Sequence, residues 1–411
     1  MKKIMIILSI TLVLGLTGCN FLPDLEPTTI AVDTTNYLEV STVDQLKEMD
    51  LNQSYQLIAD IDLDGEDWVP IGDIDTPFQG NFNGNGHTIS NLSINDNHMG
   101  FNGLFGYLKG DVEDLNISNF TIDIDDNFVI NAGGLAGMSL GSINNVHVDG
   151  TIQVASEGFN VYTGLLVGNQ HTLPQAAVDG DDFTPNEIKN NSARGSIVVG
   201  EGTIVYAGGL FGKSHNSRIY KNEIIDLILN VDGFDIGFVG GLLGQNFLYD
   251  FEASYQILVS DFLVYENIVN VVFDFDQGDV LTMGGLIGYN QNAGVNHNFV
   301  QLSSTVNDTP FIMGLIIGEH WGSRVEDNLA ILTGFANRDA SEGALAQLIG
   351  KTYDNLSPSG YVVSETDVEL RDENASIKSL ADVQGNDFYA LYFSEVEEAL
   401  ILRMKEIFFE E

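Results

Sequence analysis

The chain of 411 residues has a single cysteine, Cys19, so no disulfide bond can form within it and its stability depends on its core. Basic residues are also scarce: 16 Lys and Arg stand against 59 Asp and Glu, a formal net charge of −43. This balance excludes nucleic acid as a partner, because such binding is led by Lys and Arg contacts to phosphates. It argues equally against adhesion to anionic lipid and is typical of a solvated acidic surface.

Long hydrophobic runs are missing outside the N-terminus. Residues 1–18 open with Met1-Lys2-Lys3, continue with a short apolar stretch and end in Leu16-Thr17-Gly18, directly before Cys19. The arrangement resembles the lipobox of bacterial lipoproteins. The resemblance implies cleavage before Cys19 and a lipid on its sulfur, which would anchor the mature protein in the membrane of the bacterial cell envelope, on the extracytoplasmic side. An ordinary secretory signal with a chance cysteine is the alternative.

What the sequence does contain is a short hydrophobic motif framed by glycines, such as GLFG at 103–106 and GGLLG at 240–244. Its closing glycines are Gly106, Gly137, Gly168, Gly212, Gly244, Gly288, Gly318 and Gly350. They are 30 to 32 residues apart, except for two intervals of 44. A fixed period of this length indicates a solenoid, in which each coil buries little alone and neighbours must stack.

The repeat length decides between repeat architectures. About 31 residues suffice for three short strands and three turns. The sequence therefore predicts an all-β fold, a right-handed parallel β-helix or β-solenoid of about eight coils with short helical caps. A β-propeller is the alternative, but this period is short for a four-stranded blade.

One region resembles a known family. The segments Trp68-Val69-Pro70-Ile71-Gly72, Phe78-Gln79-Gly80 and Phe82–His87, followed by GLFG, are similar to the start of GLUG-repeat proteins. The resemblance spans about 37–393 and implies a β-solenoid on a bacterial surface protein, without naming a substrate. The motif also precedes the catalytic part of IgA-specific metallopeptidases, but the HExxH zinc motif is missing here, so that activity is not implied.

The predicted organisation follows from these patterns: a lipoprotein signal peptide at 1–18, a tether at 19–36, an N-terminal cap at 37–72, the solenoid at 73–350 and a C-terminal cap at 351–411. In the first cap, Thr42 is expected to begin a short helix. In the last, an amphipathic helix is expected from Ser394 onward, with an apolar face that closes the final coil.

Two long insertions, 169–187 and 245–263, enter the repeat at the same corner, with a short basic corner between them. The predicted ligand-binding residues are Lys213, His215 and Arg218 on the basic corner, Tyr249, Phe251 and Tyr255 on the second insertion, and Asp179, Asp181 and Asp182 on the first. Loops on a rigid scaffold are where binding residues concentrate. The alternative is that the insertions pack on each other and the basic residues offset acidic neighbours.

Two rows of polar residues recur with the repeat. The first follows the closing glycines and contains Ser139, Gln170, Ser214, Asn246 and Asn290. We expect these side chains to stack as a hydrogen-bonded ladder. The second row marks another corner of the coil and contains Asn145, Asn190, Asn191, Asn222, Asn267, Asn298 and Asn328.

Catalytic signatures are missing, since neither G-x-S-x-G nor HExxH occurs. We expect no cofactor; Ca²⁺ is the alternative, at oxygen-rich segments such as Asp60-x-Asp62-x-Asp64, where Ile71 replaces the usual final Glu. The predicted function is a non-catalytic surface protein, anchored through Cys19, that binds a glycan or a protein ligand. A polysaccharide-cleaving β-helix enzyme and a purely structural spacer are the other possibilities.

Overall fold

The computed structural model describes residues 36–64, 68–172, 185–248, 262–275, 278–306, 311–335, 345–346, 348–353, 358–364, 369–370 and 375–409. All of them belong to one compact unit, Asp33–Glu411. The predicted signal peptide and Cys19 lie in a second unit, Met1–Val32, which is outside the described residues.

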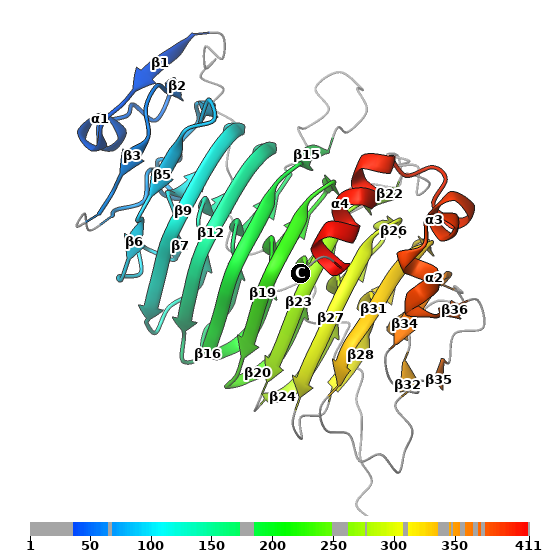
Figure 1. The fold of residues 1–411 in the computed structure, drawn as a ribbon. Helices are drawn as coiled ribbons and strands as arrows, with labels where there is room; N and C mark the ends of the chain where they lie inside the picture. Colours follow the sequence, from blue (N-terminus) through cyan, green and yellow to red (C-terminus); the bar gives the residue numbers. More distant parts are fainter. Residues whose placement is uncertain are drawn as a thin grey trace, which may run out of the picture. The chain divides into compact units, whose positions relative to one another are not determined.

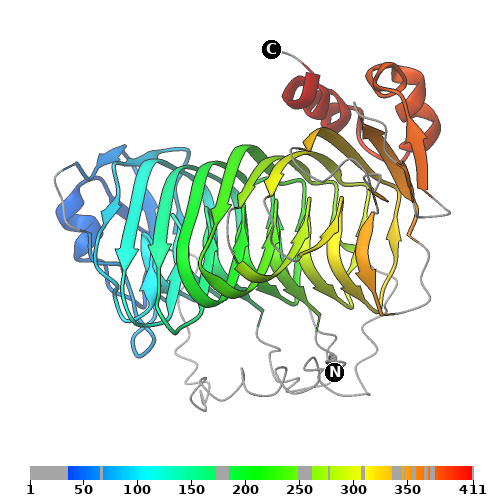
Figure 2. The ribbon, with the colours of Figure 1, turned by 90° about the horizontal axis from the view of Figure 1, so that it is seen from below.

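The chain winds into a parallel β-solenoid, which confirms the predicted fold class (Figure 1). Each coil passes through three sheets, which we name A, C and B in the order the chain meets them. In one coil these are β9 (Val112–Asp125) in sheet A, β10 (Ile130–Ala132) in sheet C and β11 (Ala136–Ser139) in sheet B. Each strand pairs in parallel with its equivalents in adjacent coils, and Figure 2 shows the stacked coils from the side.

Sheet B carries the glycine motif. Its eight strands are β8 (Phe105–Leu108), β11, β14 (Val167–His171), β17 (Phe211–His215), β21 (Leu243–Phe247), β25 (Ile287–Gln291), β29 (Ile317–Trp321) and β33 (Ile349–Thr352). Each closing glycine is the second residue of its strand. The eight strands in register confirm the predicted number of coils.

Sheets A and C share the remaining solenoid strands. Sheet C contains β7 (Phe101–Asn102), β10, β13 (Val161–Gly164), the end of β16 (Ser192–Gly208), β20 (Phe234–Gly240), β24 (Gly278–Gly284) and β28 (Phe311–Gly314). The long strands of sheet A are β9, β12 (Ile143–Ala155), the start of β16, β19 (Glu223–Val231), β23 (Ile268–Phe275), β27 (Phe299–Val306), β31 (Asn328–Phe335), β34 (Gly360–Ser364) and β36 (Ala375–Lys378). Its short edge strands are β15 (Asn186–Lys189), β18 (Ser217–Tyr220), β22 (Phe262–Tyr265), β26 (Gly294–Asn296) and β30 (Val325–Glu326). A separate pair is formed by β32 (Leu345–Ala346) and β35 (Glu369–Leu370).

The core fills the space that the three sheets enclose. One column of aliphatic side chains comes from the turn between sheets C and B: Leu104, Leu135, Leu166, Leu210, Leu242, Leu286, Ile316 and Leu348. All of them are buried, and each contributes about 1.5–3 kcal/mol of hydrophobic stabilisation. The glycines beside this column let the coils approach. A Cβ atom on Gly241 would lie 2.3 Å from the Gly285 carbonyl oxygen and 2.6 Å from Val269 Cγ1.

A ladder of buried asparagines joins the coils on the sheet A side. Its members are Asn191, Asn222, Asn267, Asn298 and Asn328. Each side-chain NH₂ group donates to the Oδ1 atom of the next asparagine over 2.9–3.0 Å, and that Oδ1 also accepts from a backbone N–H. The predicted ladder on the other row is largely wrong. Among the residues of that row, Asn246 donates to Asn290 at 3.0 Å, the single contact of this kind in the described part of the chain, whereas Gln170 donates to the Gly141 carbonyl oxygen.

The first coils are covered by the segment that precedes them. Strands β1 (Tyr37–Val40) and β2 (Ser54–Leu57) flank α1 (Val43–Lys47), which begins after Thr42, whose side chain accepts from the Gln45 N–H. The short strands β3 (Ile61–Asp62), β4 (Phe82–Asn83), β5 (Thr88–Ser90) and β6 (Ser93–Ile94) then lead into the solenoid. Trp68 is fully buried and donates its ring N–H to the Leu104 carbonyl oxygen.

The C-terminal helices differ from the prediction in place and start. They are α2 (Leu380–Gln384), α3 (Asn386–Tyr392) and α4 (Glu398–Phe409), so the last helix starts four residues after Ser394. They do not simply close the last coil, because they pack along the outer face of sheet A (Figures 1 and 2). Outward positions such as Ile268, Phe299 and Leu329 are apolar there and form one cluster with Phe388 and Met404. The position of α4 is therefore explained by its packing on this apolar strip of sheet A and not by contact with the end of the solenoid.

Candidate functional site

The two insertions leave the same edge of the solenoid, as predicted. The first runs from β14 to β15 and the second from β21 to β22. Their flanking strands are each separated by a single coil, since β17 lies between β14 and β21 and β18 lies between β15 and β22. Residues 173–184 and 249–261 are outside the described residues. The six predicted ligand residues on the insertions, Asp179, Asp181, Asp182, Tyr249, Phe251 and Tyr255, therefore lie outside them too.

Lys213 lies among aromatic rings on the outer surface of sheets B and C. Its Nζ atom is 5.2 Å from the ring centre of Tyr206, 5.6 Å from that of Phe247 and 5.8 Å from that of Tyr162. A lysine ammonium group over aromatic faces gains about 0.5–2 kcal/mol from each ring quadrupole. The three rings together fix the position of the Lys213 ammonium group. The sequence alone does not predict this contact, because the rings come from different strands.

These rings and Lys213 belong to a continuous row of side chains that we name the aromatic seam. It contains Tyr162, Tyr206 and Phe238 on sheet C, and Lys213, Phe247 and Tyr289 on sheet B. Tyr162 and Tyr206 stack with ring centres 4.9 Å apart, and Tyr206 and Phe238 follow at 5.4 Å. Tyr289 joins Phe238 at 5.7 Å and Phe247 at 5.5 Å. The sheet C members point away from the core, because their strand neighbours, such as Val205 and Ala207, point into it. Outer residues of the two sheets thus meet along the solenoid.

His215 extends the seam toward the insertion edge. Its ring centre is 4.0 Å from that of His171 and 5.5 Å from that of Phe247. Burial lowers the pKa of His171 to about 3, helped by the nearby Lys213 charge. Burial, His171 and Lys213 together hold the pKa of His215 well below its ordinary value. Both imidazoles are therefore neutral at physiological pH and contribute packing and polar atoms, not charge.

Buried oxygen atoms lie close to Lys213 in the same sheet. Asn169 and Gln245 pair with Lys213 from the strands on either side, and Ser214 and Gln170 are in the next row. Asn169 Oδ1, Gln170 Oε1, Ser214 Oγ and Gln245 Oε1 are all buried and accept no hydrogen bond in the described part of the chain. Gln170 and Ser214 alternate with Asn169 and Lys213 along their strands, so their side chains face the opposite side of sheet B. A buried polar atom without a partner costs about 1–3 kcal/mol, so the two amide oxygens of Asn169 and Gln245 beside Lys213 mark a candidate binding surface.

Arg218, the third residue of the predicted basic corner, has different neighbours. Its guanidinium group donates to Glu187 Oε1 at 3.0 Å, and Tyr220 donates to the other oxygen of that carboxylate at 2.6 Å. Arg218 lies on β18 of sheet A, whereas Lys213 and His215 lie on β17 of sheet B. The structure therefore brings Lys213 and His215 together and engages Arg218 in a separate ion pair.

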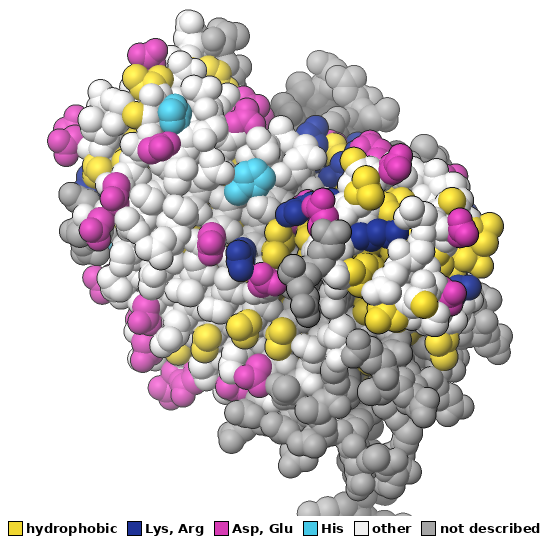
Figure 3. Space-filling view, in the orientation of Figure 1, with side chains coloured by type: hydrophobic (Ala, Val, Ile, Leu, Met, Phe, Trp, Pro, Cys, Tyr) yellow, Lys and Arg dark blue, Asp and Glu magenta, His cyan; other side chains and the backbone are white. Residues whose placement is uncertain are grey.

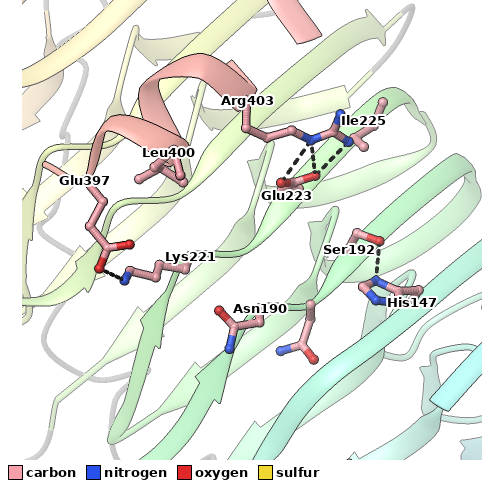
Figure 4. Close-up of a pocket in the computed structure, with 11 residues that line it drawn as sticks. His147, Asn190, Ser192, Lys221, Glu223, Ile225, Glu397, Leu400 and Arg403 are labelled. Atoms are coloured by element: carbon pink, nitrogen blue, oxygen red, sulfur yellow. Dashed lines mark hydrogen bonds and ion pairs between the residues drawn. The ribbon is translucent and has the colours of Figure 1, made fainter. Parts of the chain in front are cut away.

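A second site lies beside α4, on the outer face of sheet A (Figure 4). This pocket of about 380 Å³ is lined by His147, Asn190, Asn191, Ser192, Lys221, Glu223, Ile225, Glu397, Ala399, Leu400 and Arg403. Arg403 holds both oxygens of Glu223, and Lys221 donates to Glu397 at 2.7 Å. Basic side chains gather around the C-terminal helices on this face (Figure 3). No sequence motif marks the pocket, since its residues come from four separate segments.

Acidic residues considered for Ca²⁺ have protein partners in the structure. Asp60 accepts from the Thr88 N–H and contacts His87 at 3.1 Å, while Asp62 accepts from Asn91 at 2.7 Å. These hydrogen bonds lower the pKa of both carboxyl groups. Within the described ranges, no group of three or more His, Cys, Asp and Glu side chains has the arrangement of a metal site. In the same ranges, no helix is both long and apolar enough to span a bilayer.

Comparisons with known proteins give limited matches. No family model matches this chain. Halomucin from Haloquadratum walsbyi is 36% identical over 129 residues, which are 28% of this chain and 1% of halomucin. A protein named as a Gly-rich membrane protein, from Evansella cellulosilytica, is 36% identical over 103 residues, 23% of this chain and 12% of that protein. The chain thus spans a small part of the length of these relatives. A crystal structure assigned as an immunoglobulin A1 protease from Bacteroides ovatus has 16% identity and a TM-score of 0.38, and the match covers 87% of this chain and 88% of that one.

Proposed function

We propose that this chain is a lipid-anchored bacterial surface protein whose β-solenoid binds a glycan along the aromatic seam. The observation that carries the proposal is the patch around Lys213, in which an ammonium group among aromatic rings adjoins the amide oxygens of Asn169 and Gln245, which have no described partners. Hydroxyl groups of sugars donate to amide oxygens and accept from ammonium groups, so the patch matches their chemistry.

The arrangement of the seam favours an extended ligand. Its side chains repeat from coil to coil at the strand spacing of about 4.8 Å, so equivalent polar groups follow the solenoid axis. The rings stack on one another, and their edges and hydroxyl groups are what a ligand meets. Burial raises the pKa of Tyr162, which keeps its hydroxyl protonated and able to donate. A segment of another protein is the alternative ligand for this surface.

The proposed location rests on the N-terminus and on the relatives. Residues 1–19 carry the features of a lipoprotein signal, and one similar protein is named as a membrane protein. The likeness to GLUG-repeat proteins supports the same location. The net charge of −43 suits a soluble domain held outside the cytoplasm in a cation-rich medium.

Glycan binding is expected to depend on Lys213. In a glycan array with the soluble unit Asp33–Glu411, Lys213→Met should weaken binding to the recognised glycan about tenfold, because a hydrogen bond to a charged group is worth about 1.5–3 kcal/mol. The matched control is Lys189→Met, which removes a lysine that lies 5.9 Å from the ring centre of Tyr220, outside the seam. Equal affinities of the two variants would show that Lys213 does not belong to the binding site. Binding of a protein instead of a glycan would show that the ligand is a protein.

Membrane attachment is expected to depend on Cys19. Cys19→Ser removes the sulfur that would carry the lipid, so the protein should remain unprocessed or leave the membrane fraction. The measurement is fractionation of cells followed by mass determination of the mature N-terminus. Normal cleavage and continued membrane association of the variant would contradict the anchor.

A further inference from the structure

The pocket beside α4 contains a chain of hydrogen bonds that crosses three coils. Asn145 donates from Nδ2 to Asp114 Oδ1 at 2.7 Å, which orients its amide group. Its Oδ1 atom then faces His147 Nε2 at 3.2 Å, and His147 Nδ1 faces Ser192 Oγ at 2.8 Å. Figure 4 shows the last of these contacts at the pocket.

The orientation of Asn145 decides where the histidine proton lies. An amide oxygen only accepts, so His147 Nε2 must carry the hydrogen that it donates to Asn145. His147 Nδ1 is then unprotonated and accepts from the Ser192 hydroxyl group. Burial lowers the pKa of His147, which keeps this neutral form at physiological pH. A hydroxyl group, a base that accepts from it and a third group that orients the base are the arrangement of an activated nucleophile.

We propose that Ser192 is a nucleophile, with His147 as its general base, for the hydrolysis of short-chain acyl esters. This activity goes beyond the proposed glycan binding and is independent of it. The pocket has the size for a small acyl group, and Ile225, Ala399 and Leu400 offer it apolar contacts. Lys221 and Arg403 line the same pocket, where they are ion-paired with Glu397 and Glu223.

The chemistry balances without a cofactor. Ser192 Oγ bonds to the ester carbonyl carbon while its proton moves to His147 Nδ1, and the carbonyl oxygen becomes negative. The bond to the alcohol oxygen then breaks, and His147 returns the proton to that oxygen. Water attacks the acylated serine in the same way, giving a carboxylic acid and regenerated Ser192. The transient positive charge on His147 faces Asp114 and Glu223, both of which favour it.

The test uses the full-length protein with a fluorophosphonate probe and p-nitrophenyl acetate. The wild-type protein is expected to be labelled on Ser192, as located by peptide mass, and to hydrolyse the ester. Ser192→Ala should abolish labelling, and His147→Gln should slow it about 100-fold or more, the usual contribution of a general base. Ser196→Ala, which lies on the same strand, is the matched control and should react like wild type.

A further variant separates catalysis from mere packing. Asp114→Asn retains a residue type that tolerates the local left-handed backbone, with φ of 54°, but removes the charge that orients Asn145. Labelling should slow, and its pH midpoint should move to lower pH, because burial lowers the pKa of His147, whereas Asp114, together with Glu223, raises it. An unlabelled wild-type protein, a label on another serine, or labelling of His147→Gln at the wild-type rate would each overturn the proposal.

Discussion

Replacing Asn267 with leucine is expected to lower the free energy of unfolding by about 4 kcal/mol. The side chain makes five hydrogen bonds in a buried site, and each neighbouring polar group left without a partner costs about 1–3 kcal/mol. Asn267 is fully buried, and its Oδ1 accepts from the Asn222 backbone N–H at 3.1 Å. Its NH₂ group donates to the Ile219 carbonyl oxygen at 3.1 Å and to Asn298 at 2.9 Å. Leucine has a similar shape but supplies none of these bonds.

Urea denaturation of the unit Asp33–Glu411 measures this effect, and Asn144→Leu is the control. Asn144 occupies the position of Tyr265, two residues before the ladder position, and accepts one exposed hydrogen bond, from Asn190 at 3.0 Å. We expect its replacement to change the free energy of unfolding by less than about 1 kcal/mol. If both variants unfold at the same urea concentration, the buried ladder does not stabilise the stack of coils.

Gly241→Val is expected to destabilise the solenoid by about 3 kcal/mol through overpacking. Its Cβ atom would meet the Gly285 carbonyl oxygen at 2.3 Å, and Val269 and Val271 side-chain atoms at 2.6 and 3.0 Å. The nearest obstacle is backbone in the next coil, so a rotamer change cannot relieve the contact. The two coils would have to separate, which would also loosen the leucine column beside them.

The matched control for this variant is Gly200→Val. Gly200 also lies in a strand, but a Cβ atom there would meet only Ala155 Cβ, at an ordinary 3.7 Å. The thermal midpoint of Gly200→Val should stay near that of wild type while that of Gly241→Val falls. Equal midpoints would show that the glycine motif does not control the distance between coils.

The repeat made the fold predictable, because a single feature recurs at every coil. The closing glycines predicted the number of coils and the common corner at which both insertions enter. Their register is fixed because a shift of one coil against the next would place a glycine where the core needs a large side chain. The hydrogen-bonded ladder was predicted on the wrong row. Ser214 and Asn246 pair in register on sheet B, but the side chains of their row differ in type and length from coil to coil. The observed ladder has an asparagine in each of its coils, as Asn222 and Asn267 show.

The site was less predictable, because its residues come from different coils and sheets. Lys213 stood out by its charge, but Tyr206 and Tyr289 did not, since each resembles an ordinary strand residue. Arg218 is close to Lys213 in sequence, yet the chain turns between β17 and β18, so Arg218 lies on sheet A and forms an ion pair with Glu187. His147 and Ser192 meet because they occupy paired positions on β12 and β16, although the first insertion places them 45 residues apart in the sequence. Aligning the repeats by strand register would have placed these two side by side.

The attachment of the C-terminal helix has a consequence for the order in which the protein matures. Arg403 and Glu397 bond to Glu223 and Lys221, partners 180 and 176 residues earlier in the chain. Coils can assemble on one another while the polypeptide is being synthesised, but Ile268, Phe299 and Leu329 stay uncovered until the last residues arrive. A chain truncated before α4 would therefore expose an apolar strip and would depend on chaperones to avoid aggregation.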